Sequence, residues 1–386
     1  MASILGFYRR ISLAFNPSEA PSPNGLKFGI LGAANIAPIA IIRPVKNHPD
    51  AVLYAVAARD QTRADDFAKK WSIPKAYGGD GAYQKLLDDP EVDVVYNPLP
   101  NGLHYEWTMK ALAAGKHVLL EKPSADTAEE TRKMFELADK KGLVLLEAFH
   151  YRFHPAAQRI KEIVASGSLG PIKSIHTALT LPSGVIKDND IRLSYDLGGG
   201  SLMDCGCYAM SFARYLASAD PIRVASATAD TNSKFPKIDL GASAKLIFPS
   251  ASEGGREIEG RIDSHFRLPG WGPFGLLPRI RPVVFGRVVC EEGEVELTNF
   301  VFPWVYHSLT IKGKDGKSRT EKVYGTPGWT TYRYQFEAFM DKLRGRTPQH
   351  WFDAADSIAN MFWIEKVYEE NGLTSRPKST AEVPIA

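Results

Sequence analysis

The sequence predicts an α/β protein with an N-terminal doubly wound parallel sheet and a C-terminal α/β domain built on a large, open, mainly antiparallel sheet. Between residues 27 and 149, short apolar runs alternate with helical patterns, which is typical of a parallel sheet covered by helices on both faces. Beyond residue 170, strand-like runs follow one another with turn residues between them and few helical patterns, which indicates an antiparallel sheet.

The chain length of 386 residues exceeds what one hydrophobic core usually supports and favours two domains. We expect an N-terminal arm over residues 1–26, a parallel-sheet domain over 27–149 and an open-sheet domain over 150–330. Residues 331–386 are expected to form helices that return to the first domain, followed by a tail.

The composition excludes several classes of protein. Hydrophobic residues make up 44% of the chain, as in a globular protein. The net charge of +3 comes without a Lys/Arg block, so nucleic acid is not an expected partner. No apolar run approaches the ~20 residues that cross a membrane. The three cysteines, Cys205, Cys207 and Cys290, lack metal spacing, so we expect no metal site and a reduced, cytoplasmic protein.

The first 26 residues are poor in acids and end in a proline-rich stretch. Their apolar residues recur at helical spacing, at Ile4, Tyr8, Ile11 and Phe15. Two interpretations stay open. An arm that packs on the protein body or on a second subunit is favoured, and a mitochondrial transit peptide is the alternative because Arg9 and Arg10 lie in an acid-poor segment.

The first strand, predicted over 27–31, runs into a small-residue turn that opens a helix toward Asn47. This turn is a G-x-A-x-x-A variant of the dinucleotide-binding fingerprint, in the strand-to-helix context that the fingerprint requires. Gly32 allows the tight turn and Ala34 permits close approach of a pyrophosphate. We expect Gly32, Ala34, Asn35 and Ile36 to contact the cofactor, with amides at the helix start facing its phosphates.

The second strand, predicted over 52–58, ends at Arg59 rather than at a carboxylate. An NAD enzyme usually places an acid at this strand tip to bind the ribose hydroxyls. A guanidinium pairs instead with a 2′-phosphate, so Arg59 predicts NADP as the cofactor. Asp60, one residue later, keeps NAD as the less favoured alternative, and a solvated turn residue is the structural alternative for Arg59.

The remaining strands of the first sheet are predicted at 75–77, 93–97, 117–120 and 143–147. The carboxyl ends of such strands open onto the ligand crevice. The strand over 117–120 ends in Glu121, Lys122 and Pro123, which predicts a lysine held at the cofactor, in a rigid presentation set by the proline. Thr127 and Glu130 fit a capping box that starts the next helix.

The second domain is predicted from seven strand-like runs and one helix. The strands are expected at 172–181, 223–230, 243–248, 258–267, 283–290, 295–300 and 307–312. A helix over 201–217 falls between the first two, and helices over 332–343 and 354–370 close the chain.

Five motifs in order give the chain a resemblance to the glucose–fructose oxidoreductase/inositol dehydrogenase (Gfo/Idh/MocA) family of NAD(P)-dependent enzymes. They are the 29–37 turn, Pro100-Asn101 with His104, Glu121-Lys122-Pro123, the 147–155 stretch and the 198–208 stretch. Residues 56–60 and 73–78 are similar to the dimeric dihydrodiol dehydrogenase and NADP-linked D-xylose dehydrogenase branch. The resemblance implies a Rossmann domain, followed by a domain whose open sheet commonly forms the interface of a homodimer.

The resemblance also implies site residues. Pro98, Asn101, His104, Glu121 and Lys122 would contact the cofactor. Asn101 is equally a natural helix N-cap.

The reacting centre is expected at Lys122, Asp204 and Tyr208. Hydride transfer to or from a carbinol carbon needs a matching proton transfer at its oxygen. Asp204 and Tyr208 lie four apart on one predicted helix, so both face one site. The Lys122 ammonium is expected to lower the pKa of Tyr208 toward neutrality. Whether Tyr208 or Lys122 is the immediate acid/base stays open.

Softer candidates for the substrate pocket are His150, Tyr151 and Arg152, an aromatic-basic run that is as often structural. Aromatic walls are possible at Trp271, Trp304, Trp329 and Tyr332, although such residues also fill cores. His176 is expected to be a sheet residue rather than a ligand.

These observations predict an NADP-dependent dehydrogenase or reductase acting on CH–OH groups. The expected substrate is a small molecule, a sugar or a trans-dihydrodiol, with hydride moving between the nicotinamide and a secondary alcohol or hemiacetal carbon. One alternative is a reductase of a ketone or imine in a biosynthetic pathway. The other is a catalytically silent NADP-binding sensor, which the combination of Lys122, Asp204 and Tyr208 disfavours.

Overall fold

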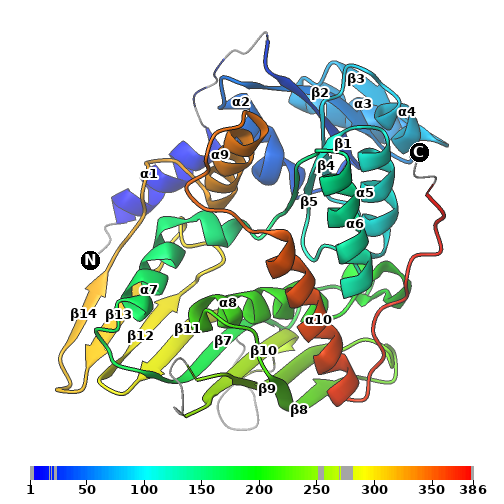
Figure 1. Cartoon of the computed structure of the whole chain (residues 1–386). Helices are drawn as coiled ribbons and strands as arrows, with labels where there is room; N and C mark the ends of the chain where they lie inside the picture. Colours follow the sequence, from blue (N-terminus) through cyan, green and yellow to red (C-terminus); the bar gives the residue numbers. More distant parts are fainter. Residues whose placement is uncertain are drawn as a thin grey trace.

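The protein consists of two sheets with helices between them (Figure 1). The computed structural model describes residues 4–16, 18, 20, 24–250, 256–268, 270 and 281–383. The predicted fold class is confirmed: one sheet is parallel and the other is mainly antiparallel. Trp271 and most of the 268–282 segment lie outside the described residues.

The first sheet has six parallel strands in the order β3-β2-β1-β4-β5-β6. Their bounds are β1 Leu26–Leu31, β2 Ala51–Ala57, β3 Lys75–Tyr77, β4 Val94–Asn97, β5 His117–Leu120 and β6 Leu145–Glu147. The strand order reverses between β1 and β4, which places the ligand crevice of such a sheet beyond the carboxyl ends of these strands. The strand that leads to Lys122, β5, lies next to β4.

Helices cover both faces of this sheet. They are η1 Pro38–Ile42 with α2 Arg43–Lys46, α3 Gln61–Trp71, α4 Ala82–Leu87, η2 Asn101–Leu103 with α5 His104–Ala113, and α6 Ala128–Lys140. Thr127 caps α6 as predicted, since its hydroxyl accepts a hydrogen bond from the Glu130 amide, and the Glu130 carboxylate accepts from the Thr127 hydroxyl and the Ser379 amide. The helix predicted after β1 begins with a π-helical turn, with Pro38 at its first position.

The second sheet has eight strands in the order β14-β13-β12-β11-β7-β10-β9-β8. Their bounds are β7 Ile172–Pro182, β8 Arg223–Asp230, β9 Gly241–Phe248, β10 Ile258–Leu268, β11 Val283–Cys290, β12 Gly293–Thr298, β13 Ser308–Gly313 and β14 Ser318–Glu321. Neighbouring strands are antiparallel except for β7 and β10. The edge strand β14 was not predicted, because its four residues carry no apolar signal.

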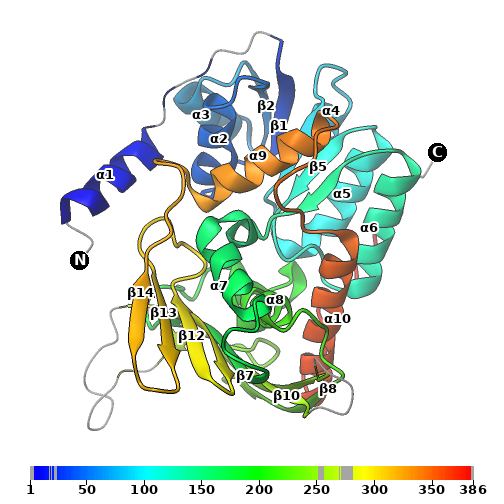
Figure 2. The ribbon, with the colours of Figure 1, turned by 60° about the vertical axis from the view of Figure 1, so that its left-hand side comes forward.

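One face of the second sheet is covered and the other is open (Figure 2). Helices α7 Pro155–Ala165 and α8 Cys207–Ala217 pack on the covered face, between this sheet and the first domain. The π-helical turn η6, Leu202–Gly206, leads into α8, so the helix predicted over 201–217 changes type within its length. Short 3-10 turns complete the chain path: η3 His150–Phe153, η4 Ile191–Leu193 and η5 Tyr195–Leu197.

The last two helices connect the domains. Helix α9, Thr331–Leu343, packs against η1 and α2, and α10, Ala354–Glu370, packs against α6 and α8. Helix α1, Ile4–Phe15, lies against the segment between β12 and α9: the Phe15 and Trp304 ring centroids are 6.2 Å apart. Within the described residues, no helix is long and apolar enough to cross a membrane.

Candidate active site

A relay of partly buried ion pairs joins the end of β5 to η6, the turn that leads into α8. The Lys122 Nζ lies 2.5 Å from Oδ1 of Asp204, and Nε of Arg192 lies 2.8 Å from Oδ2 of the same carboxylate. The relay continues to Asp190, whose Oδ1 is 3.2 Å from the Arg192 guanidinium. Side-chain exposure rises along this relay from 13% at Lys122 to 41% at Arg192, so it runs outward toward solvent.

The ion pairs of the relay determine the protonation states of Lys122 and Asp204. Burial alone lowers the pKa of Lys122, but the adjacent Asp204 carboxylate outweighs it and the pKa is raised. Burial opposes ionisation of Asp204, yet the Lys122 and Arg192 charges hold the pKa of this carboxyl well below its usual range. Lys122 is therefore an ammonium and Asp204 a carboxylate near neutral pH.

Tyr208 lies beside Lys122 and belongs to a second chain of contacts. The Lys122 Nζ is 5.2 Å from the centroid of the Tyr208 ring. The Tyr208 hydroxyl lies 2.9 Å from Nε2 of His150, whose Nδ1 lies 2.8 Å from the Thr331 hydroxyl at the start of α9. Tyr332 stacks on His150 with ring centroids 4.0 Å apart. The predicted neighbourhood of Lys122, Asp204 and Tyr208 is thus present in the structure.

The expectation that Lys122 lowers the pKa of Tyr208 is wrong for this structure. Burial raises the pKa of Tyr208 well above its usual value, and nearby Tyr332 and Glu121 add to the rise. The Lys122 charge is neutralised by Asp204, which explains why it does not favour a phenolate. Tyr208 is therefore a protonated phenol, and burial also keeps His150 neutral by lowering its pKa.

Two residues predicted to contact the cofactor, His104 and Glu121, form contacts within the protein near Lys122. The two ring nitrogens of His104 lie 2.7 Å from the carbonyl oxygens of Pro123 and Leu99, and the side chain is fully buried. Burial lowers the pKa of His104 to about 4, although the two carbonyl contacts oppose the shift. Glu121 is 9% exposed and accepts a hydrogen bond from the Tyr96 hydroxyl. His104 thus holds the backbone on both sides of the crevice strand end, and the contact of His104 and Glu121 with the cofactor stays a prediction.

The glycine-rich turn before η6 is held from two sides. The Asn101 side chain donates a hydrogen bond to the Gly198 carbonyl at 2.9 Å, which ties the turn to the end of β4. On the other side, buried Arg376 donates to the Gly199 carbonyl and to Asp239, whose other oxygen accepts from the Leu202 amide. A Cβ at Gly200 would lie 2.3 Å from Arg376 and from Asp239, so only glycine fits there.

The ends of β1 and β2 carry the turn and the arginine that the sequence assigns to the cofactor. Gly32 has φ +87°, which favours glycine at the turn after β1. The Asp60 carboxylate accepts a hydrogen bond from the Arg63 amide as the N-cap of α3, so it is turned toward the helix. Arg59 is exposed at the end of β2, and the Arg63 guanidinium binds the Ala33 carbonyl of the turn.

The remaining predicted contacts lie away from the relay. The Tyr151 hydroxyl bonds to Ser211 within the core, and Arg152 stacks on Tyr215 and pairs with Asp356, so we withdraw both from the substrate contacts. Trp304 and Trp329 both line a hollow beside α1. His176 is a sheet residue, as expected, and Pro98, Ala34, Asn35 and Ile36 keep some exposure at the strand ends.

Arg192 was missed by sequence reasoning, as were Thr331, Asp239 and Arg376. Within the residues that the structure describes, no group of acids, histidines or cysteines is arranged to hold a metal ion.

Residues 26–149 match the model of the oxidoreductase family with an NAD-binding Rossmann fold, GFO_IDH_MocA, and residues 157–265 match the C-terminal domain model of the same family. A D-xylose 1-dehydrogenase (NADP(+)) from Haloferax volcanii is 37% identical over 349 residues, which cover 89% of this chain and 97% of that protein. The chain belongs to the GFO/IDH/MocA oxidoreductase family. It is therefore an oxidoreductase with an NAD(P)-binding Rossmann domain.

Other relatives differ in the substrate that they are named for. A dTDP-3,4-didehydro-2,6-dideoxy-alpha-D-glucose 3-reductase from Saccharopolyspora spinosa is 34% identical over 60% of this chain and 66% of that protein. A trans-1,2-dihydrobenzene-1,2-diol dehydrogenase from Mus musculus is 32% identical over 59% of this chain and 67% of that protein. An aldose-aldose oxidoreductase from Caulobacter crescentus shares the fold, with a TM-score of 0.74 and 24% identity over 90% of this chain and 98% of that one.

Proposed function

We propose that the protein transfers hydride between NADP and a secondary alcohol or hemiacetal carbon of a sugar or trans-dihydrodiol. The observation that carries this proposal is the pairing of the Lys122 ammonium with Asp204 beside the Tyr208 phenol, at the carboxyl end of β5. The likeness to the Haloferax volcanii enzyme over nearly its whole length supports a sugar substrate. A diol is supported by the shorter likeness to the Mus musculus enzyme.

The nucleotide end favours NADP over NAD. Asp60 is committed to capping α3 and is turned from the position where a carboxylate would bind ribose hydroxyls. Arg59 offers its guanidinium at the strand tip, where it would pair with a 2′-phosphate. Gly32, Ala34, Asn35 and Ile36 would hold the pyrophosphate, and Pro98 and Asn101 would line the crevice. When bound, NADP supplies the hydride donor or acceptor.

The protein's own part in the reaction is to move a proton at the substrate oxygen. Tyr208 is protonated, so in the direction of carbonyl reduction its hydroxyl gives the proton to that oxygen. His150, held through Thr331, contacts the Tyr208 hydroxyl and orients it toward that oxygen. The phenolate that remains on Tyr208 takes its next proton from solvent. Lys122 keeps its ammonium near the same oxygen and stabilises negative charge there. In the direction of alcohol oxidation the reverse step starts from the Tyr208 phenolate, which takes the proton of the substrate hydroxyl.

A second candidate is a reductase of a ketone in a nucleotide-sugar pathway, favoured by the likeness to the Saccharopolyspora spinosa enzyme. A non-catalytic NADP-binding sensor is the alternative from another class, and the relay of Lys122, Asp204 and Arg192 argues against it. A sensor has no need to neutralise a buried ammonium with a carboxylate at the crevice.

A spectrophotometric screen tests these candidates. The purified protein is incubated with NADP⁺ and a panel of aldoses, polyols and trans-dihydrodiols, and with NADPH and a panel of keto sugars. We expect NADP⁺ reduction with at least one aldose or diol. Turnover of keto sugars alone would favour the second candidate, and NADP binding without turnover of any compound would favour the sensor.

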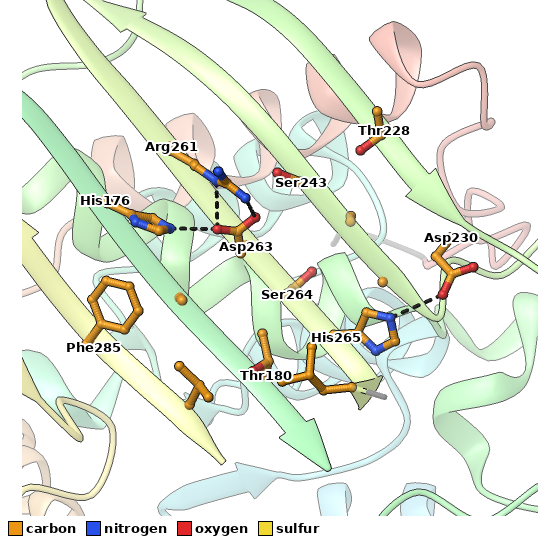
Figure 3. Close-up of a pocket in the computed structure, with 15 residues that line it drawn as sticks. His176, Thr180, Thr228, Asp230, Ser243, Arg261, Asp263, Ser264, His265 and Phe285 are labelled. Carbon is orange, nitrogen blue, oxygen red and sulfur yellow. Dashed lines mark hydrogen bonds and ion pairs between the residues drawn. The ribbon is translucent and has the colours of Figure 1, made fainter. Parts of the chain in front are cut away.

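We also propose a homodimer through the open face of the second sheet. This face carries a hollow of about 440 Å³, shown in Figure 3, where the helices lie behind the sheet. Phe285 and Ala178 lie there among ion pairs, with Asp263 2.6 Å from His176 and 2.9 Å from Arg261. Apolar patches ringed by charges are typical of such interfaces. Light scattering should give a dimer that Phe285→Glu dissociates, and a monomeric native protein would contradict the proposal.

A further inference from the structure

Arg192 is bound through two of its three guanidinium nitrogens. Nε lies 2.8 Å from Oδ2 of Asp204, and Nη1 lies 3.2 Å from Oδ1 of Asp190. Nη2 has no hydrogen-bond partner among the described residues, yet it is not one of their buried unpaired atoms. Because the side chain is 41% exposed, Arg192 presents the two N–H groups of Nη2 to solvent.

The backbone around Arg192 is held as closely as its side chain. The Arg192 amide donates a hydrogen bond to the Asp190 carboxylate at 2.9 Å, and the Arg192 carbonyl accepts one from the Gly200 amide at 2.9 Å. A Cβ at Gly199 would lie 2.5 Å from the Arg192 carbonyl oxygen, so this close approach needs glycine. Holding a long side chain in one orientation costs conformational entropy. Such support is expected where a side chain binds a ligand.

The unpaired nitrogen lies close to the reacting centre. Arg192 and Lys122 bind the two oxygens of one carboxylate, that of Asp204. In the planar guanidinium, one N–H of Nη2 is parallel to the Nε–H that binds Asp204, so it points to the same side. The Lys122 ammonium has three N–H groups and contacts two oxygens of Asp204, which leaves it a donor for the substrate. Each cation therefore keeps a donor beside the same carboxylate.

We propose that Arg192 binds a second oxygen of the substrate, on the carbon next to the reacting one, and so selects vicinal diols and aldoses over simple alcohols. This inference rests on the proposed function, because it takes the oxygen at Lys122 and Tyr208 as the reacting one. Oxygens on adjacent carbons are the closest pair that such a substrate can offer to two neighbouring donors. A site that binds a hydroxyl discriminates against the analogue that lacks it. Since water can reach Nη2, we expect this discrimination to be moderate.

The charges of this cluster favour an uncharged substrate. Two cations, Lys122 and Arg192, alternate with two carboxylates, Asp204 and Asp190, so the cluster has no net attraction for an anion. A carboxylate or phosphate binds arginine most strongly through two parallel N–H groups of neighbouring nitrogens. On Arg192 it would compete with the two carboxylates that Nε and Nη1 already bind. Nη2 therefore suits the single oxygen of a hydroxyl group better than a sugar acid or a sugar phosphate.

A cycle that changes both the residue and the substrate tests the proposal. One substrate pair is D-xylose with 2-deoxy-D-xylose, and the other is trans-1,2-cyclohexanediol with cyclohexanol. For each pair, kcat/KM with NADP⁺ is measured in the native protein and in Arg192→Gln. The native protein should prefer the compound with the second hydroxyl about tenfold, and Arg192→Gln should reduce this preference to about twofold. Differences in intrinsic reactivity within a pair cancel between the two proteins.

A binding measurement separates this inference from the proposed function. Isothermal titration of the NADPH-saturated protein compares the affinities within each pair, because an alcohol cannot be oxidised in that complex. If no compound is oxidised with NADP⁺, the proposed function fails. A binding preference that Arg192→Gln abolishes would still support the contact, and a preference within one pair alone would identify that pair's class as the substrate class.

Two further variants serve as controls. Arg192→Lys keeps a cation for Asp204 without the planar fork, so it should show a preference between those of the native protein and Arg192→Gln. Arg159→Gln makes the same charge change on α7, at an arginine that is also paired with two carboxylates and is 38% exposed, and it should keep the native preference. If Arg192 acted only through Asp204, both members of a pair would lose equally in Arg192→Gln. An unchanged preference in that variant, or no preference in the native protein, would overturn the proposal.

Discussion

Two aspartates that lie close to the π-helical turn η6 have opposite surroundings: Asp204 belongs to the turn, and Asp239 reaches its first amide from the segment between β8 and β9. Asp239 accepts hydrogen bonds from the Leu202 amide, the Tyr368 hydroxyl and the Arg376 guanidinium, and the Asp239 and Arg376 side chains are fully buried. Asp204, two residues beyond Leu202, pairs with Lys122 and Arg192. The side chain of Lys122 is 13% exposed and that of Arg192 is 41% exposed. The Asp239 cluster is shielded from solvent, whereas the Asp204 cluster reaches solvent at Arg192.

This difference in burial suggests different roles for the two clusters, structural support for one and chemistry for the other. A closed, satisfied network fixes the glycine-rich turn, and with it the position at which Asp204 enters the site. In the Asp204 cluster, Lys122 and Arg192 pair with the same carboxylate at the crevice, where we expect a substrate oxygen to approach. We therefore propose that the Asp239 cluster is a structural support and that the Asp204 cluster is part of the reacting centre, and the following predictions separate the two roles.

The largest expected effect is on folding. Arg376→Met leaves the Asp239 carboxylate buried without a counter-ion, so the free energy of unfolding should fall by about 3–5 kcal/mol. Urea denaturation measures it. The matched variant Arg192→Met, at the exposed end of the Asp204 cluster, should lower the free energy of unfolding by about 1 kcal/mol or less. Equal losses in the two variants would remove the distinction between the clusters.

Tyr208→Phe should lower turnover about a hundredfold, near 2.7 kcal/mol in activation free energy, without a comparable loss of stability. Because burial raises the pKa of Tyr208, the phenol stays protonated through neutral pH. The native rate of carbonyl reduction should thus be flat there and decline only at strongly basic pH. The pH–rate profile of the variant should lack this decline, and a profile identical to that of the native enzyme would exclude Tyr208 as the donor.

Arg59→Ala should weaken NADP binding about tenfold or more, about 1.4 kcal/mol, while NAD binding changes little. Arg63→Ala is the control variant, because the Arg63 guanidinium binds the Ala33 carbonyl of the turn after β1. It should weaken both cofactors alike. Fluorescence titration with each cofactor checks the pair, and equal losses for NADP and NAD in Arg59→Ala would exclude a 2′-phosphate contact.

The smallest effects are expected at the outer end of the relay. Arg192→Gln removes one of two cations on Asp204 and should raise the Michaelis constant by a factor of about five, near 1 kcal/mol, with Arg192→Lys restoring part of it. Asp204→Asn should also act mainly on the Michaelis constant, and more strongly, since Asp204 touches both cations. Steady-state kinetics checks both variants. A purely structural role would lower stability without changing the Michaelis constant.

The sequence predicted the first sheet better than the site. Strand and helix alternation placed β1 to β6 within a few residues, because buried parallel strands are short apolar runs. The family motifs brought Lys122, Asp204 and Tyr208 together, which the structure also does. The pKa of Tyr208 was mispredicted, because the sequence does not show that Asp204 neutralises Lys122 or how deeply the phenol is buried.

The missed residues come from distant parts of the chain. Arg192 lies in the short 3-10 turn η4, which has no sequence pattern of its own. The charges of Asp190 and Arg192 shortly before the 198–208 motif were the available signal. Arg376 gave none, since it follows the last helix and reaches Asp239 across 137 positions. Tyr151 and Arg152 illustrate the reverse error, because an aromatic-basic run looks the same in sequence whether it lines a cleft or packs in a core.

Turnover of Lys122→Met, measured on the best substrate from the screen together with NADP affinity, tests the central claim most directly. The claim is that the Lys122 ammonium at the end of β5 and the Tyr208 phenol act on one substrate oxygen. Turnover should fall about a hundredfold or more, while NADP should still bind, because its phosphate contacts come from the Gly32 turn and Arg59. Adding Tyr208→Phe should lower turnover by less than the product of the two single losses. Near-normal turnover of Lys122→Met would contradict the account.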